Sequence, residues 1–132
     1  RSDHRNGIWR IINHAIENGI VKYEGNIESV REYIHVIDAA KASIEILADE
    51  FKNQCITLTG KESMRVYDLL NMISEIMGIK SKVQFEEKDY LGHYIRTPYA
   101  YKEKFEFKYI SNKHIDIGQG LLKLIKSISK NK

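Results

Sequence analysis

The sequence predicts a mixed α/β protein in which helices alternate with short strands. Segments with apolar residues at helical spacing are separated by short apolar runs that suit strands. Hydrophobic residues make up 42% of the 132 residues and charged residues 30%, which is near the average for a globular protein. No internal repeat or interdomain linker interrupts the alternation, so we expect a single domain over residues 1–132.

The first part of the chain is predicted to form a helix followed by two strands. Residues 7–18 carry apolar side chains on one helical face, and Gly19 follows as a stop signal. Residues 20–23 are typical of a short strand, and a turn is expected at residues 25–26. Residues 30–36 are rich in aliphatic and aromatic side chains, which favours a second strand.

The middle of the chain is predicted to contain a helix and a strand. Asp38 is placed to cap a helix over residues 39–49. One stripe of that helix holds apolar residues, and its small side chains would allow close packing on a sheet; the stripe consists of Ala40, Ile44 and Leu47. The next strand is expected at residues 55–59, with Cys55 as a small buried hydrophobe.

The last part of the chain contains the clearest helical pattern. Ser63 is a suitable N-cap for a helix whose apolar residues repeat at helical spacing until Gly78 ends it. A strand is expected over residues 82–87 and an irregular, aromatic and basic stretch over residues 89–112. A final amphipathic helix is predicted over residues 117–129.

Composition argues against several classes of protein. The net charge of +3 is a small basic excess, so a role in nucleic-acid binding is not expected. No apolar run approaches the roughly 20 residues that span a bilayer, so no membrane segment is expected. The single cysteine excludes a disulfide within the chain and fits a reducing cytoplasm. The polar start without an initiator Met suggests a fragment or a processed chain.

Several catalytic signatures are missing from the sequence. No glycine-rich dinucleotide fingerprint and no Walker loop occur. The histidines lack the pairwise spacing of a metal site, and no serine elbow is present. The sequence by itself therefore shows no complete catalytic apparatus.

Residues 31–40, Arg-Glu-Tyr-Ile-His-Val-Ile-Asp-Ala-Ala, carry a family resemblance. The run resembles the signature of extended short-chain dehydrogenases/reductases, the NAD-dependent epimerase/dehydratase family. Residues 20–26 resemble the strand and turn of that family that lie along the nucleotide base. Residues 62–69 and 116–122 resemble later segments, so the likeness covers nearly the whole chain in the family's order. The chain is therefore similar to the C-terminal, substrate-binding part of such an enzyme.

The resemblance implies a nucleotide-sugar site around Arg31. In the family this arginine contacts the diphosphate, and a guanidinium suits that role because it is always charged and offers paired donors. Asn6 begins the first helix, whose N-terminus favours anions, and Arg96 is a candidate second phosphate ligand. The backbone along the base would come from Val21, Lys22 and Tyr23. Ordinary strand pairing, a loop position for Asn6 and packing of the Arg96 loop over the core remain open alternatives.

The departures from the family limit what this chain can do alone. The family's glycine-rich loop and catalytic Tyr-x-x-x-Lys pair are not found in their usual context. We therefore expect a catalytically incomplete segment of an NAD- or NADP-dependent nucleotide-sugar epimerase or dehydratase. Its expected partners are a nucleotide-diphospho-sugar and a Rossmann half that is absent here. Exposure of the surface toward that half would favour homo-oligomers. The alternative is a non-catalytic protein-interaction or ligand-binding module.

Overall fold

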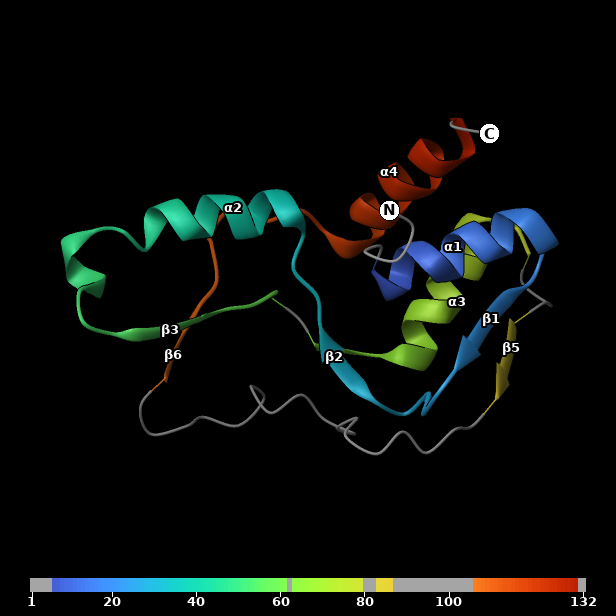
Figure 1. The fold of residues 1–132 in the computed structure, drawn as a ribbon, viewed down its shortest axis with the longest axis horizontal. Coiled ribbons are helices and arrows are strands. Elements are labelled where there is room, and N and C mark those ends of the chain that lie inside the picture. The colour runs from blue at the N-terminus through green and yellow to red at the C-terminus, as the bar shows by residue number, and fades with distance from the viewer. Residues whose placement is uncertain (1–5, 62, 80–82, 87–105, 131–132) are drawn as a thin grey trace.

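The computed structural model describes residues 6–61, 63–79, 83–86 and 106–130. Its elements form two groups, which lie at the two ends of the molecule in Figure 1. The first group is the core lobe, which consists of α1 (Gly7–Asn18), β1 (Val21–Glu24), α3 (Val66–Ile76), β5 (Val83–Glu86) and α4 (Ile117–Lys130). The second group is the α2 lobe, which consists of α2 (Val36–Glu45), the 3-10 helix η2 (Asp49–Phe51), β3 (Cys55–Leu58) and β6 (Glu106–Tyr109).

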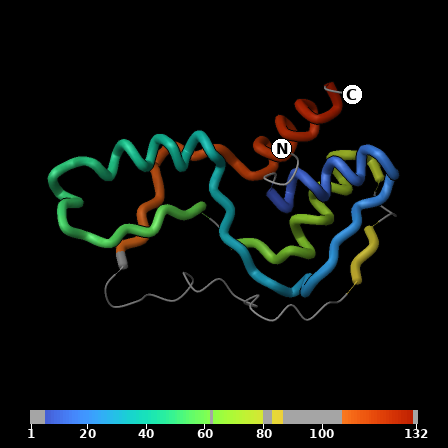
Figure 2. Tube along the Cα trace, in the orientation of Figure 1, coloured from blue at the N-terminus to red at the C-terminus, as the bar shows by residue number. Residues whose placement is uncertain are grey.

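Two further strands, β2 (Val30–Glu32) and β4 (Ser63–Arg65), lie between the lobes. They pair antiparallel, with Arg31 opposite Met64. Figure 2 follows the chain from the core lobe through β2 into the α2 lobe, back through β4, and finally from β6 to α4. The two lobes are therefore joined by several passes of the chain.

Each lobe holds one parallel pair of strands. In the core lobe β1 pairs with β5, with Val21 opposite Val83. In the α2 lobe β3 pairs with β6, with Cys55 opposite Glu106. The predicted class of helices alternating with short strands is confirmed. None of the described helices is both long and apolar enough to cross a membrane.

The hydrophobic core lies in the core lobe. Side chains from the three helices and β1 are buried together there, and α3 contributes more of them than any other element. The buried cluster consists of Ile12, Ala15, Val21, Val66, Leu69, Leu70, Ile73, Leu121 and Ile128. The apolar faces predicted for the first, third and last helices are therefore the faces that pack.

Both ends of helix α1 are set by residues that lie next to it in the sequence. Asn6 adopts an extended conformation, and its Oδ1 accepts a hydrogen bond from the Trp9 N–H at 2.8 Å. Gly19 ends the helix with a φ of 66°, a left-handed conformation that glycine adopts without steric cost. The prediction of a helix over residues 7–18 is confirmed.

The predicted boundary between the second strand and second helix is wrong. The strand ends at Glu32 rather than residue 36, and the helix runs from Val36 to Glu45 rather than over residues 39–49. The cap is His35, whose Nδ1 accepts a hydrogen bond from the Ile37 N–H at 3.2 Å. Asp38 is not the cap, because its Oδ2 accepts a hydrogen bond from the Ile115 N–H at 2.6 Å.

The predicted cap of the third helix is also wrong. Ser63 lies in β4, and α3 begins at Val66 without a side-chain cap. The N–H groups of Val66 and Tyr67 instead donate to the backbone carbonyls of Ser29 and Ile27, both at 2.9 Å. Backbone carbonyls of the connection between β1 and β2 therefore accept hydrogen bonds from the first N–H groups of α3, although the two segments are distant in the sequence.

Three expectations about the α2 lobe fail. Cys55 is exposed rather than buried. Strand β6 lies within the stretch that was expected to be irregular, and residues 89–105 of that stretch lie outside the described residues. The stripe of Ala40, Ile44 and Leu47 is exposed, and the side of α2 that is buried carries Ala42 instead.

Candidate functional site

Arg31, the candidate diphosphate ligand, lies at the centre of β2 and is half-buried. Its Nη1 donates a hydrogen bond to the Val30 carbonyl at 2.9 Å. The guanidinium is thus held against its own strand, and its other donors keep the planar arrangement that suits an anion. Its assignment to phosphate stays a prediction.

Tyr33, which follows β2, is an electrostatic neighbour of this arginine. Burial raises the pKa of the Tyr33 hydroxyl, the positive charge of Arg31 opposes that rise, and Tyr23 adds to it. The Tyr23 hydroxyl also lies against the turn after β1, where a Cβ on Gly25 would be 3.0 Å from it. Tyr33 is thus an electrostatic neighbour of both Arg31 of β2 and Tyr23 of β1.

The side chains of β1 differ in what they can contribute to a site. Val21 is fully buried in the core, so only its backbone can meet a ligand. The Lys22 Nζ lies 3.4 Å from Glu24 Oε1 and 3.7 Å from Glu86 Oε1. One edge of β1 is paired with β5, and no described strand pairs with its other edge. That edge leaves backbone groups for the predicted contact with a base.

The remaining predicted ligands are not brought to Arg31 by any described contact. Asn6 caps α1, which uses the side-chain oxygen that was expected near the diphosphate. Arg96 lies outside the described residues. Both assignments stay predictions.

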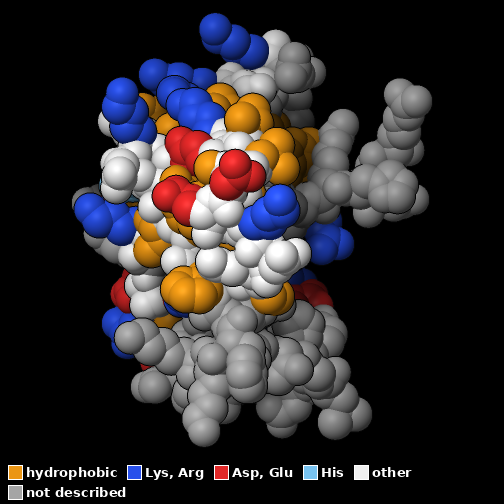
Figure 3. Space-filling view, turned by 90° about the vertical axis from the view of Figure 1, so that its left-hand side faces the viewer, with side chains coloured by type: hydrophobic (Ala, Val, Ile, Leu, Met, Phe, Trp, Pro, Cys, Tyr) orange, Lys and Arg blue, Asp and Glu red, His pale blue; other side chains and the backbone are white. Residues whose placement is uncertain are grey.

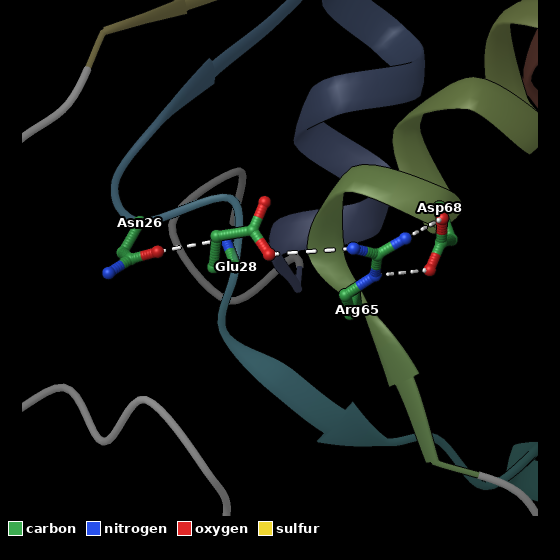
Figure 4. A network of polar contacts seen from close by, with 4 residues as sticks. All are labelled: Asn26, Glu28, Arg65 and Asp68. Carbon is green, nitrogen blue, oxygen red and sulfur yellow. Dashed lines mark hydrogen bonds and ion pairs between the residues drawn. The ribbon is translucent and has the colours of Figure 1, made fainter.

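A polar network fixes the turn that connects β1 to β2 (Figure 4). The Asn26 Oδ1 accepts a hydrogen bond from the Glu28 N–H at 2.8 Å. Arg65 lies between two acids, with its Nη1 3.5 Å from Glu28 Oε2 and its Nε 2.9 Å from Asp68 Oδ2. Arg65 is exposed, and its two ion pairs join this turn to the start of α3. The network therefore holds the two candidate strands in position.

A second network beside Arg31 was not predicted from the sequence. Glu32 accepts hydrogen bonds from Lys108 Nζ at 2.6 Å and from the Thr59 hydroxyl. Burial acts to raise the pKa of Glu32, but the hydrogen bonds from Lys108 and Thr59 and the charge of Lys108 outweigh it, so the pKa is lowered. Glu32 thus ties β2 to β6 and to the residue that follows β3. An acid beside Arg31 is visible in the sequence, but Lys108 is 76 positions away and no local pattern links the two.

A small cavity lies where the lobes meet. Its lining includes Tyr33, His35, Asp38, Lys61 and His114, but not Arg31. The Asp38 carboxylate is buried, and its Oδ1 is without a hydrogen-bond partner among the described residues. No group of three or more metal-ligating side chains occurs in the described part of the chain. The cavity is therefore distinct from the predicted phosphate position.

No protein-family model matches the chain, and no curated protein sequence matches it either. Solved structures do match. UDP-glucuronic acid 4-epimerase from Bacillus cereus, in complex with NAD and UDP-4-deoxy-4-fluoro-glucuronic acid, aligns with a TM-score of 0.76 and 17% identity over 96% of this chain and 40% of its own. The dTDP-glucose 4,6-dehydratase from Bacillus anthracis, in complex with NAD, aligns with a TM-score of 0.69 and 18% identity over 96% of this chain and 40% of its own. GDP-L-fucose synthetase from Naegleria fowleri, bound to NADP, aligns with a TM-score of 0.68 and 14% identity over 95% of this chain and 39% of its own.

These matches define the fold of the chain. The chain shares its fold with part of each of these three enzymes, and this agrees with the fold that the resemblance at residues 31–40 implies. The chain spans about two-fifths of the length of the structures it matches.

Proposed function

We propose that this chain is the nucleotide-sugar-binding part of an NAD- or NADP-dependent nucleotide-sugar epimerase or dehydratase. The observation that carries the proposal is the structural match of 95–96% of the chain to three enzymes named for UDP-, dTDP- and GDP-sugars. Their sugars and reactions differ, so the part that their substrates share is the nucleotide diphosphate. In this proposal the chain binds that nucleotide-diphosphate part.

In this proposal Arg31 binds the diphosphate. Its guanidinium is partly withdrawn from solvent and lies near Tyr33, so its field is screened less than that of a fully exposed arginine. The edge of β1 that no described strand pairs with would offer the backbone groups of Val21, Lys22 and Tyr23 to the base. Because the nucleotide is remote from the reacting carbon, its binding energy serves to hold the sugar in place.

The cofactor would belong to another part of the protein. A pyrophosphate cradle needs a glycine-rich turn between a strand and a helix. In the described chain β2 leads into α2 and β4 into α3, and neither junction contains a glycine. The residues present therefore do not fit NAD(P), and we assign no step of the reaction to them. We expect no turnover from the 132-residue chain.

Calorimetric titration of the 132-residue chain with UDP-glucose, dTDP-glucose and GDP-fucose tests the proposal. We expect weak binding of at least one of them, and Arg31→Ala should weaken it about tenfold or more because a charged hydrogen bond contributes about 1.5–3 kcal/mol. Lys126→Ala is the matched control, since it removes one positive charge from an exposed position on α4. Equal affinities of wild type and Arg31→Ala would remove the phosphate role from Arg31.

A further inference from the structure

Three of the five buried polar or charged residues in the described chain line the cavity between the lobes. Asp38 is 3% exposed, Thr59 is 7% exposed and Ser111 is 8% exposed. They lie on segments that follow three different strands, because β2 leads into α2, Thr59 follows β3 and Ser111 comes shortly after β6. The fold thus gathers these side chains at one place, and the hydrogen bonds that they have left to make decide what the cavity can bind.

The two hydroxyl groups offer oxygen lone pairs rather than protons to the cavity. The Thr59 hydroxyl donates its hydrogen bond to Glu32, and the Ser111 hydroxyl donates to Glu45 Oε1 at 3.4 Å. Since a hydroxyl has one proton and two lone pairs, only acceptor capacity remains on each oxygen. The hydroxyls therefore suit an occupant that is a hydrogen-bond donor or a cation.

The Asp38 carboxylate adds a negative charge to these acceptors. Its Oδ2 accepts the Ile115 N–H at 2.6 Å, whereas its Oδ1 has no hydrogen-bond partner among the described residues. Lys61 and His114 also line the cavity, but they are exposed, neither donates to Oδ1, and solvent screens an exposed charge. His35 uses its Nδ1 as an acceptor to cap α2, so its ring is neutral in this arrangement. A buried carboxylate without a counter-charge is unfavourable, so the cavity favours a positive occupant.

The size of the cavity limits the occupant to one small species. The cavity has a volume of about 30 Å³, and a water molecule needs about 10–15 Å³ on the same measure. Potassium and ammonium ions are about as large as a water molecule, and unlike water they also neutralise the carboxylate. A divalent ion fits less well, because no group of three or more metal-ligating side chains occurs in the described part of the chain.

We propose that this cavity binds one water-sized monovalent cation, potassium or ammonium, between the Asp38 carboxylate and the hydroxyl oxygens of Thr59 and Ser111. Figure 1 shows the start of α2 beside the segment that leads from β6 to α4, and Asp38 already joins the two through Ile115. The cation adds a second link between the same segments. Arg31 does not line the cavity, so this site and the proposed nucleotide-sugar site can fail independently of each other.

Diffuse attraction of cations to the protein surface is a weaker explanation for such binding. The chain carries a net charge of +3. On the end of the molecule formed by the α2 lobe, Lys and Arg side chains lie among the Asp and Glu side chains (Figure 3). A stabilising effect that depends on the size of the cation at constant ionic strength therefore reports on the cavity rather than on the surface.

Thermal unfolding of the 132-residue chain in different chloride salts tests the proposal. At a constant ionic strength of about 150 mM, Tm should be about 3 °C or more higher in potassium or ammonium than in tetramethylammonium, which is too large for the cavity. Asp38→Asn keeps the size of the side chain but removes its charge, and it should abolish this difference. Asp49→Asn, which removes an exposed carboxylate from η2, is the control and should retain the difference.

Three results would overturn the cation site. One is an equal Tm of the wild type in all three salts, which would leave the cavity to water. Another is a potassium effect that Asp38→Asn retains, because the cation would then bind elsewhere. The third needs no variant, so it decides the matter even if Asp38→Asn does not fold. Crystals of the wild-type chain grown with thallium(I), a potassium-sized cation that scatters anomalously, should show an anomalous peak beside Asp38, and a cavity without that peak would contradict the proposal.

Discussion

Glu32 ties strand β2, which lies between the lobes, to the α2 lobe. Its side chain is 11% exposed and accepts hydrogen bonds from Lys108 of β6 and from Thr59, which follows β3. Its neighbour in the chain, Arg31, is the candidate phosphate ligand. We infer that Glu32 helps to fix the position of β2, and hence of Arg31, relative to the α2 lobe.

The lowered pKa of Glu32 predicts a loss of stability in acid. A carboxylate whose pKa is lower in the folded state contributes stability above its unfolded pKa of about 4.3, and this contribution is lost as pH falls through the folded pKa. Glu32→Gln should lower the free energy of unfolding by about 1 kcal/mol at pH 7. It should also reduce the fall in stability between about pH 5 and pH 3.

Urea unfolding of wild type and variant at pH 7 and at pH 3 measures both effects. Glu50→Gln, which removes an exposed carboxylate from η2, is the control and should change neither quantity appreciably. If Glu32→Gln keeps the full pH dependence of the wild type, the hydrogen bonds to Lys108 and Thr59 do not stabilise the fold.

At the residue scale, local signals could be predicted and distant partners could not. Asn6 and Gly19 act within one turn of α1, and the sequence alone indicates both ends of that helix. Arg31 is identified by a contiguous run of residues. Thr59 and Lys108 meet Glu32 only because β3 and β6 pair, and the spacing of residues in the sequence gives no sign of that pairing.

At the element scale, the misplaced boundaries have a common cause. The starts of α2 and α3 are set by tertiary contacts rather than by the nearest capping side chain. Asp38 is drawn to the Ile115 N–H, and the carbonyls of Ile27 and Ser29 take the place of a cap on α3. Capping preferences describe isolated helix ends, so they fail where a neighbouring element satisfies the end.

The close approach of Gly60, two residues after β3, to the backbone of Tyr33, just after β2, predicts a strongly destabilising substitution at Gly60. A Cβ at this position would lie 1.8 Å from the Tyr33 carbonyl oxygen, which is backbone and cannot rotate away. Gly60→Ala should therefore cost about 2 kcal/mol or more, as expected when two backbone segments are forced apart.

The control is Gly7→Ala, because a Cβ at Gly7 would meet nothing within 4 Å. This substitution should be neutral or slightly stabilising, since alanine favours helix. Denaturant midpoints of the two variants make the comparison. Equal stability of the two alanine variants would mean that Gly60 and the Tyr33 backbone do not approach each other as closely as the structure has them.

At the scale of the whole molecule, the fold class follows from the order of helices and strands, and the match to nucleotide-sugar enzymes confirms it. The division into two lobes could not be predicted. The apolar stripe on α2 resembles the stripes on α1 and α3 in sequence, yet the latter are buried and the former is exposed. Periodicity predicts that a helix has an apolar face, but not whether the layer that covers this face belongs to the same segment of chain.

The separation of the core from the α2 lobe predicts unequal local stability in the 132-residue chain. The cluster in the core lobe includes side chains that are fully buried, whereas the large apolar side chains of α2 are mostly exposed. Backbone amides exchange through local opening, and opening is easier where few apolar contacts are lost. Amides of α2 and of the β3–β6 ladder should therefore exchange about tenfold or more faster than those of α1 and α3, after correction for intrinsic rates.

Hydrogen exchange followed by mass spectrometry measures this difference, with the frayed ends of each helix left out of the comparison. Equal protection in the two lobes would mean that the molecule opens as one cooperative unit, and that the hydrogen bonds of Glu32, Asp38 and Glu45 hold the α2 lobe as firmly as the apolar core holds the rest.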